Sequence, residues 1–288
     1  MNRRDFLITV PALAALPAAS APAIDGKARM RSAICAYSFR DALKAKTMTY
    51  DDLVRLAVGL NVDGLDLTVY WFPDTSDAFL LPLRRLAYKS AVEIYSISIR
   101  SDMCQPTEEK RSNELAELKK WVDVAQRLGA GHIRVFGGKV PKDATEDQAA
   151  GWVTEILKQG GEYAGKQGII LGLENHGGIT SRAERILQIV KQVDSPWVGI
   201  NVDTGNFERD AYAQVATLLP YAANVQLKVE VKDKNGVKEP SDWNRFIKMF
   251  ASSGYKGYVA LEYEDKSDPA VAVPLLIRKL KRILRTVA

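Results

Sequence analysis

Short apolar runs alternate with longer stretches of helical periodicity along most of the chain. The apolar runs have the length and the β-branched content of buried strands, and they cover residues 32–37, 64–69, 93–100, 132–136, 169–174, 198–202, 223–228 and 258–262. The helical stretches cover residues 50–60, 78–91, 107–128, 145–167, 181–193, 211–219, 242–253 and 270–286. Eight strand-helix units in a chain of 288 residues predict a closed (β/α)8 TIM barrel.

An open, doubly wound sheet is the structural alternative. It would need a glycine-rich phosphate-binding turn after the first strand, and residues 37–41 read Tyr-Ser-Phe-Arg-Asp instead. No shift in composition and no long linker rich in Ser, Pro or Gly divides the chain. We therefore expect a single barrel domain over residues 24–288.

The first 23 residues have the layout of an export signal. Arg3 and Arg4 precede a short apolar run, which ends in Ala-Pro-Ala at 21–23. The arginine pair resembles the twin-arginine type of signal. Prolines within the run weaken the alternative of an amphipathic N-terminal helix. The sequence thus predicts cleavage near Ala23 and a periplasmic or exported protein, with no stable membrane insertion after cleavage.

Composition narrows the choice of partners. The chain is 47% apolar and 26% charged, and its net charge of +5 is mild and evenly spread, which argues against nucleic acid as a partner. Cys35 and Cys104 permit one disulfide without requiring it. The sequence is also compatible with a homo-oligomer.

Oxygen-bearing side chains stand at the ends of four consecutive predicted strands. In a TIM barrel the catalytic residues lie at the carboxyl ends of the strands, and from the fifth strand onward these ends carry Glu174, Asp203, Gln226 and Glu262. One such residue alone is more often an ion-paired or solvated strand end. Four such residues at the ends of four consecutive strands predict a site for one divalent ion, Mn2+ or Mg2+, with Co2+ or Zn2+ as alternatives.

Four motifs around these residues point to a known family. They are LENHGG at 173–178, NVDTGN at 201–206, NVQLK at 224–228 and LEYE at 261–264. Together they resemble motifs of the xylose isomerase-like TIM-barrel superfamily, which includes ketose epimerases, dehydratases and endonuclease IV. The resemblance implies one divalent ion held by Glu174, Asp203, Gln226 and Glu262, with the first and last carboxylates exchanging protons with the substrate.

Two positions depart from the family pattern. The family usually has histidine where Gln226 stands, and often histidine three residues after the strand-six aspartate, where this chain has Asn206. Glutamine is an accepted variant in dehydratase-like members. The loss of both imidazoles argues against a typical ketose epimerase and against the nuclease.

The predicted site suits proton transfer next to a carbonyl. A divalent ion that binds a carbonyl oxygen and its neighbouring hydroxyl makes the intervening carbon-bound proton more acidic. With one of Glu174 and Glu262 as base and the other as acid, the outcome is isomerisation or epimerisation of a sugar. If the substrate carries a leaving group β to the carbonyl, the same deprotonation would expel that group instead. The protein would then be a lyase or dehydratase that acts on a keto-glycoside or keto-cyclitol. A carbohydrate-binding barrel without turnover is the alternative from another class.

Several other residues near the strand ends are candidate contacts for a small carbohydrate substrate. They are Asp66, Tyr70, Trp71, Arg100, His132, Arg134, His176, Asn206 and Lys228. For each of them the structural alternative is an ion pair or a hydrogen bond inside the barrel. Export favours an unphosphorylated sugar, because phosphorylated sugars are mainly cytoplasmic.

Overall fold

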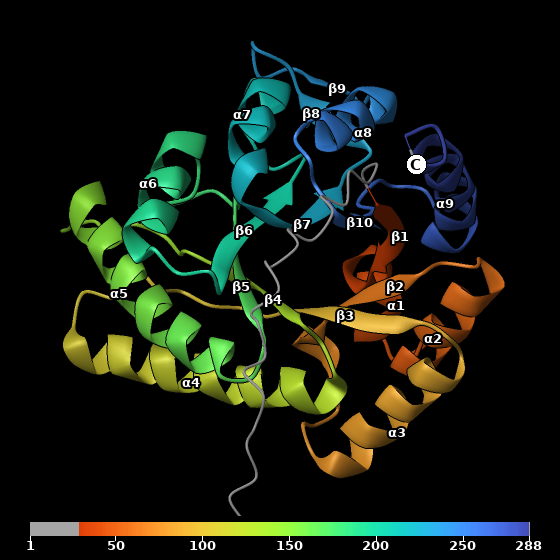
Figure 1. The fold of residues 1–288 in the computed structure, drawn as a ribbon, viewed down its shortest axis with the longest axis horizontal. Coiled ribbons are helices and arrows are strands. Elements are labelled where there is room, and N and C mark those ends of the chain that lie inside the picture. The colour runs from red at the N-terminus through yellow and green to blue at the C-terminus, as the bar shows by residue number, and fades with distance from the viewer. Residues whose placement is uncertain (1–28, 288) are drawn as a thin grey trace, which may run out of the picture.

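Eight parallel strands close into a barrel in the computed structural model, which describes residues 29–287 (Figure 1). Their order around the barrel is β1-β10-β7-β6-β5-β4-β3-β2. The strands are β1 (Met30–Cys35), β2 (Gly64–Thr68), β3 (Glu93–Ser98), β4 (His132–Phe136), β5 (Ile170–Glu174), β6 (Val198–Asp203), β7 (Ala222–Leu227) and β10 (Gly257–Leu261). The predicted (β/α)8 fold is confirmed, and the predicted signal at 1–23 lies outside the described residues.

Helices surround the barrel on its outer side (Figure 1). They are α1 (Arg40–Lys44), α2 (Tyr50–Gly59), α3 (Asp77–Lys89), α4 (Glu108–Leu128), α5 (Glu146–Gly165), α6 (Ala183–Val193), α7 (Ala211–Leu218), α8 (Trp243–Ser252) and α9 (Pro269–Leu284). Capping boxes at Thr49 and Thr145 begin α2 and α5, where the threonine hydroxyl accepts a backbone N–H of the first turn. Among the described residues, no helix is both long enough and apolar enough to cross a membrane.

The structure adds short elements that the sequence pattern did not predict. An antiparallel hairpin of β8 (Glu230–Lys232) and β9 (Lys238–Pro240) stands between β7 and α8. Short 3-10 helices follow β1 and β2, at η1 (Ala36–Phe39) and η2 (Val69–Trp71), and η3 (Leu219–Tyr221) precedes β7. Elements of three or four residues are too short to show a hydrophobic period, so the pattern left them as loops.

The two faces of each barrel strand meet different surroundings. On β5, Leu171 points outward, since a Cβ built on Gly160 of α5 would lie 3.3 Å from its Cδ1. Gly172, the next residue, points inward, where an added Cβ would lie 2.2 Å from Nε2 of His132. The apolar core therefore lies between the barrel and the helices, and much of the barrel interior is polar.

A chain of hydrogen bonds crosses the barrel interior. Asn224 Nδ2 donates to Asn201 Oδ1 over 2.8 Å, and Asn201 Nδ2 donates to Gln226 Oε1 over 2.8 Å. Gln226 Nε2 then donates to Asp66 Oδ2 over 2.9 Å, and Ser98 Oγ donates to Asp66 Oδ1. These groups are fully buried, and because they satisfy one another the barrel tolerates them beneath the strand ends.

Both cysteines are buried free thiols. Cys35 ends β1 inside the barrel, and Cys104 lies in the loop between β3 and α4. The disulfide that the sequence permitted is therefore not formed.

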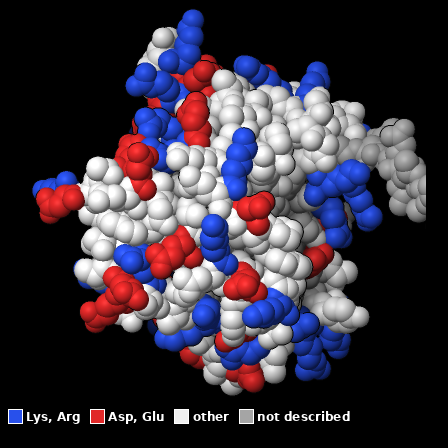
Figure 2. Space-filling view, turned by 60° about the vertical axis from the view of Figure 1, so that its left-hand side comes forward, with Lys and Arg blue, Asp and Glu red and all other residues white. Residues whose placement is uncertain are grey.

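Charged side chains of both signs are interspersed over the face shown in Figure 2. The described part of the chain also has exposed ion pairs, such as that of Arg182 with Glu146 at 2.5 Å. Solvent screens such pairs, so they contribute little to stability.

We predict that Gly172→Ala lowers the free energy of unfolding by about 1 to 3 kcal/mol, because the added methyl group would overlap the buried His132 ring. Urea denaturation measures the change. Gly151→Ala is the matched control, since Gly151 is exposed on α5 with open space around its Cβ position. A Gly172→Ala protein as stable as the wild type would contradict the proposed packing of His132.

Candidate active site

A cavity of about 370 Å3 opens at the carboxyl ends of the barrel strands. Its wall is formed by Tyr37, Tyr70, Arg100, Ser101, Arg134, Phe136, Glu174, His176, Asn206, Lys228, Glu262 and Glu264. Most of the predicted site residues thus meet at one place. Those that do not reach the wall are Asp66, Trp71, His132, Asp203 and Gln226.

Glu174 ends β5 and meets Arg134 of the neighbouring strand β4. Arg134 pairs in register with Gly172, so its side chain points into the barrel beside that of Glu174. Its Nε lies 2.8 Å from Glu174 Oε2, and both side chains are almost fully buried. Asn206 Nδ2 donates to the other oxygen, Oε1, over 2.9 Å. Glu174 is therefore held from two sides.

Backbone contacts fix the neighbouring strand ends. Asn175 forms two hydrogen bonds with the backbone of Asp203, one to its C=O and one from its N–H, and so ties the end of β5 to that of β6. Asp203 Oδ1 accepts the backbone N–H groups of Gly205 and Asn206. On the opposite side, Ser38 bonds the backbone of Leu261 and Tyr263 around Glu262. The carboxylates thus rest on a rigid frame.

Lys228 provides the second cation of the site. It follows Gln226 by two residues, and its Nζ lies 3.1 Å from Glu262 Oε2 and 3.4 Å from Asp203 Oδ2. It also contacts Glu264 at the edge of the cavity. The side chain is only 10% exposed, so this ammonium group balances a buried carboxylate cluster.

The carboxyl groups of the cluster have different pKa values. Burial raises the pKa of Glu174, and the charges of Asp203 and Glu262 add to the shift, while Arg134 opposes it. The Arg134 guanidinium contacts Glu174 Oε2 without hydrogen-bond geometry, and its charge opposes the shift without cancelling it. Burial likewise raises the pKa of Asp203 to about 7. At Glu262 burial is outweighed by Lys228 and Arg134, and its pKa lies below the usual range.

The donor set fits a hard divalent ion in type and charge. Glu174 Oε2 and Asp203 Oδ2 are buried and accept no hydrogen bond; Arg134 Nε lies 2.8 Å from the first and Lys228 Nζ 3.4 Å from the second, and the carboxylates outnumber these two cations. Gln226 Oε1 accepts from Asn201 and keeps one lone pair. Glu174, Asp203, Glu262 and Gln226 would thus hold the ion.

In the structure, the cationic groups of Lys228 and Arg134 lie among these carboxylates. Across residues 29–287 no group of three or more His, Cys, Asp or Glu side chains is arranged to hold a metal ion. Binding of the ion as predicted would thus require the Lys228 ammonium to leave its place between Asp203 and Glu262.

Aromatic and cationic side chains form the rest of the cavity wall. Arg134 donates to the Tyr70 hydroxyl over 3.0 Å, and the Arg100 guanidinium lies 4.4 Å from the centre of the Tyr70 ring. His176 stacks on Phe136 with ring centres 4.0 Å apart, and partial burial lowers its pKa. The imidazole is therefore neutral at neutral pH and available as a hydrogen-bonding group.

The remaining predicted contacts lie away from the cavity. His132 bonds Ser96 inside the barrel, and burial lowers the pKa of its imidazole to about 3. Asp66 belongs to the interior hydrogen-bond chain, where burial raises its pKa. Trp71 stacks behind Tyr37, with ring centres 6.0 Å apart. These three side chains support the wall rather than form it.

The family assignment follows from a sequence comparison. The family model described as xylose isomerase-like TIM barrel matches residues 54–286. The chain belongs to this family. No curated protein sequence matches it.

Solved structures of the same fold include sugar epimerases and a dehydratase. A D-psicose 3-epimerase with D-tagatose from Clostridium cellulolyticum H10 superposes with a TM-score of 0.68 at 17% identity, over 90% of this chain and 96% of that one. A 3-keto-D-glucoside 4-epimerase from E. coli superposes with a TM-score of 0.68 at 14% identity, over 90% of this chain and 100% of that one. A probable 3-DHS dehydratase involved in petrobactin synthesis from Bacillus anthracis superposes with a TM-score of 0.64 at 16% identity, over 89% of this chain and 99% of that one. At these identities the likeness establishes the fold.

Four cavity residues were not among the predicted ones: Tyr37, Ser101, Phe136 and Glu264. The sequence contains a signal that could have predicted Glu264 as a site residue, because Glu264 follows the predicted ligand Glu262 by two residues. Phe136 ends β4 in phase with Arg134, so it carries the same signal. Tyr37 lies in η1, where strand periodicity no longer applies.

We predict that Lys228→Met increases the stabilisation of the protein by a divalent ion. The substitution removes the ammonium that competes for the carboxylates, so added Mn2+ should raise the Tm by at least about 3 °C more than in the wild type, roughly 1 kcal/mol for a chain of this size. Without metal the variant should unfold at a lower temperature, because buried carboxylates lose their counter-ion. Scanning calorimetry with and without Mn2+ measures both effects.

Lys232→Met is the matched control, since Lys232 pairs with Glu208 outside the carboxylate cluster. Equal Mn2+ shifts in the Lys228→Met protein and the wild type would contradict the competition.

Proposed function

We propose that the protein is a sugar isomerase or epimerase that moves a proton at a carbon next to a carbonyl. The proposal rests on one observation: the carboxyl groups of Glu174 and Glu262 face the same cavity, each beside a buried cation. The opposite directions of their pKa shifts agree with it. Two carboxyl groups whose surroundings separate their pKa values are suited to act as acid and base. This function belongs to the range of activities represented among proteins of the same fold.

In the proposed mechanism, Glu262 is the base and Glu174 the acid. Without the ion Lys228 keeps Glu262 ionised, and the ion would take over that role once the ammonium has left, so the Glu262 carboxylate accepts the proton from the substrate carbon. Glu174 returns a proton to the carbon, while Asn206 and Arg134, which contact its two oxygens, orient its carboxyl group. A divalent ion bound by Glu174, Asp203, Glu262 and Gln226 would polarise the carbonyl and make the carbon acid stronger.

The cavity wall suits a carbohydrate. Tyr37, Tyr70 and Phe136 contribute apolar ring surface to the wall, against which the C–H groups of a sugar would pack, and Arg100 and His176 offer hydrogen-bonding groups for its hydroxyls. The sequence predicts export, and we therefore propose an unphosphorylated sugar as the substrate.

We predict that the protein incubated with Mn2+ and keto-sugars in D2O introduces deuterium at the carbon next to the carbonyl. NMR and mass spectrometry of the recovered sugar detect the label, because the proton on the acid exchanges with solvent between the two transfers. Deuterium without a released fragment supports the isomerase or epimerase. Release of water or of a substituent, from keto-sugars or their glycosides, would assign the same deprotonation to a dehydratase or lyase instead. No label and no product would contradict catalysis.

Glu174→Gln and Glu262→Gln should each lower kcat by about 100-fold to 10,000-fold, the usual contribution of a general acid or base. Circular dichroism and Tm serve as controls for folding. Glu114→Gln is the matched control, since Glu114 is a partly buried carboxyl group that accepts the backbone N–H of Asp102 and does not itself line the cavity. A Glu262→Gln enzyme with wild-type kcat would remove Glu262 from the role of base.

A further inference from the structure

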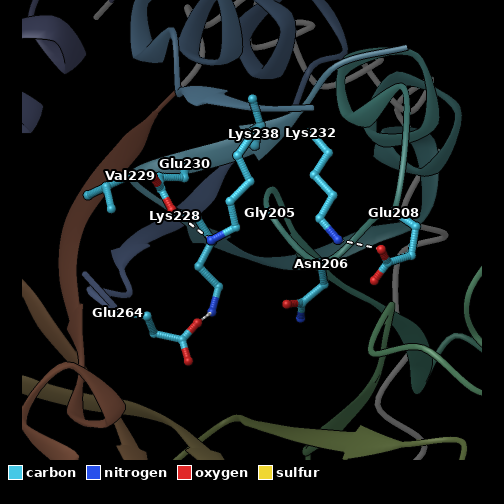
Figure 3. A pocket seen from close by; sticks show the side chains of 10 residues that line it. Gly205, Asn206, Glu208, Lys228, Val229, Glu230, Lys232, Lys238 and Glu264 are labelled. Carbon is cyan, nitrogen blue, oxygen red and sulfur yellow. Dashed lines mark hydrogen bonds and ion pairs between the residues drawn. The ribbon is translucent and has the colours of Figure 1, made fainter. Parts of the chain in front are cut away.

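A second hollow of about 260 Å3 adjoins the cavity at the barrel mouth. We name it the hairpin cleft, because the β8–β9 hairpin forms one side of it (Figure 3). The loop after β6 forms the other side. The cleft shares Asn206, Lys228 and Glu264 with the central cavity, so the two hollows meet at these side chains.

Charged side chains make up most of the wall of the hairpin cleft, which also includes Val229 and Val231. Three lysines line it, and each pairs with a glutamate that also lines it: Lys228 with Glu264, Lys232 with Glu208, and Lys238 with Glu230 (Figure 3). Two of these pairs are one-to-one, and Lys228 is shared between Glu264 and the carboxylate cluster, so the cleft carries no net positive charge. A net positive cleft would favour a phosphate or a carboxylate, whereas this one offers matched donors and acceptors to a neutral ligand.

The cleft is held in place by close backbone contacts. The hairpin is tied to the loop after β6 by a hydrogen bond from Asp210 N–H to Asp233 C=O over 2.8 Å. Gly205 lies at the floor, where an added Cβ would be 2.7 Å from the Lys228 side chain and 2.8 Å from the Glu230 carbonyl oxygen. A residue with a side chain there would fill the passage between the strand ends and the hairpin.

We propose that the hairpin cleft is a subsite for a second, neutral sugar unit, so that the substrate is a disaccharide or a sugar glycoside rather than a free monosaccharide. This inference rests on the proposed function, which places the reacting unit in the central cavity. A polyhydroxylated ring matches the paired ammonium and carboxylate groups of the cleft. A flat aromatic substituent does not, because no aromatic side chain lines the cleft among the described residues. Asn206 bonds Glu174 and also lines the cleft, so the two units would lie next to each other.

Isothermal titration calorimetry with the full-length protein tests the subsite. The probes are the ketose disaccharides turanose, lactulose and isomaltulose, with D-fructose as the monosaccharide reference. We expect at least one disaccharide to bind about tenfold more tightly than D-fructose, a gain of about 1.4 kcal/mol. In Lys238→Met, which removes the ammonium paired with Glu230, the ratio of the two affinities should fall to about threefold or less.

The matched control is Lys234→Met, because Lys234 lies in the turn of the same hairpin and does not line the cleft. It should keep the wild-type ratio. Disaccharides that bind no better than D-fructose, or a Lys238→Met protein that keeps the full ratio, would overturn the subsite. Binding of inorganic phosphate that Lys238→Met abolishes would also overturn it, since the cleft would then be an anion site.

The outcome is separable from that of the proposed function. Deuterium exchange with D-fructose and no preference for disaccharides would reject the subsite and leave the isomerase intact. A disaccharide preference that depends on Lys238, without deuterium exchange into any probe, would support the subsite and reject the proposed reaction.

Discussion

The carboxylate cluster at the barrel mouth is the constraint on which the rest of the site depends. Glu174, Asp203 and Glu262 are buried side by side, and two cations, Arg134 and Lys228, lie among them. An isolated buried carboxylate is costly, so the cluster persists only where cations, hydrogen-bond donors or protons compensate it. That compensation is uneven, which is why neighbouring carboxyl groups differ in pKa. The difference is what makes acid-base chemistry feasible in one cavity.

Stability comes from a different part of the molecule. The apolar layer between barrel and helices is continuous, while the barrel interior beneath the site consists largely of hydrogen-bonded side chains. Gly172 illustrates the division, because its missing side chain makes room for His132. The interior network holds the strand ends at fixed spacing, and the outer layer compensates for the polar groups that the network buries.

Eight strand-helix units were enough to predict the barrel, and the rule that catalytic residues lie at the strand ends was enough to bring Glu174 and Glu262 to one cavity. The depth of a side chain within the barrel was not predictable. Asp66 and His132 point into the barrel, but they lie below the cavity. The alternation of side chains along a strand shows which face of the strand a residue is on, and not how far along the barrel axis it lies. The hairpin was missed because its strands are three residues long. The pairing of Lys228 with three carboxylates is a tertiary feature that spacing alone does not encode.

Lys228 joins three parts of the molecule that the sequence presents separately. Its ammonium group neutralises the carboxylate cluster, its side chain lines the central cavity, and its contact with Glu264 borders the hairpin cleft. A change at Lys228 therefore alters charge balance and cavity shape together, whereas Lys238 reaches only the cleft. Because of this difference, effects on the second sugar unit are measurable apart from effects on proton transfer, with the same fold and the same reacting cavity in both proteins.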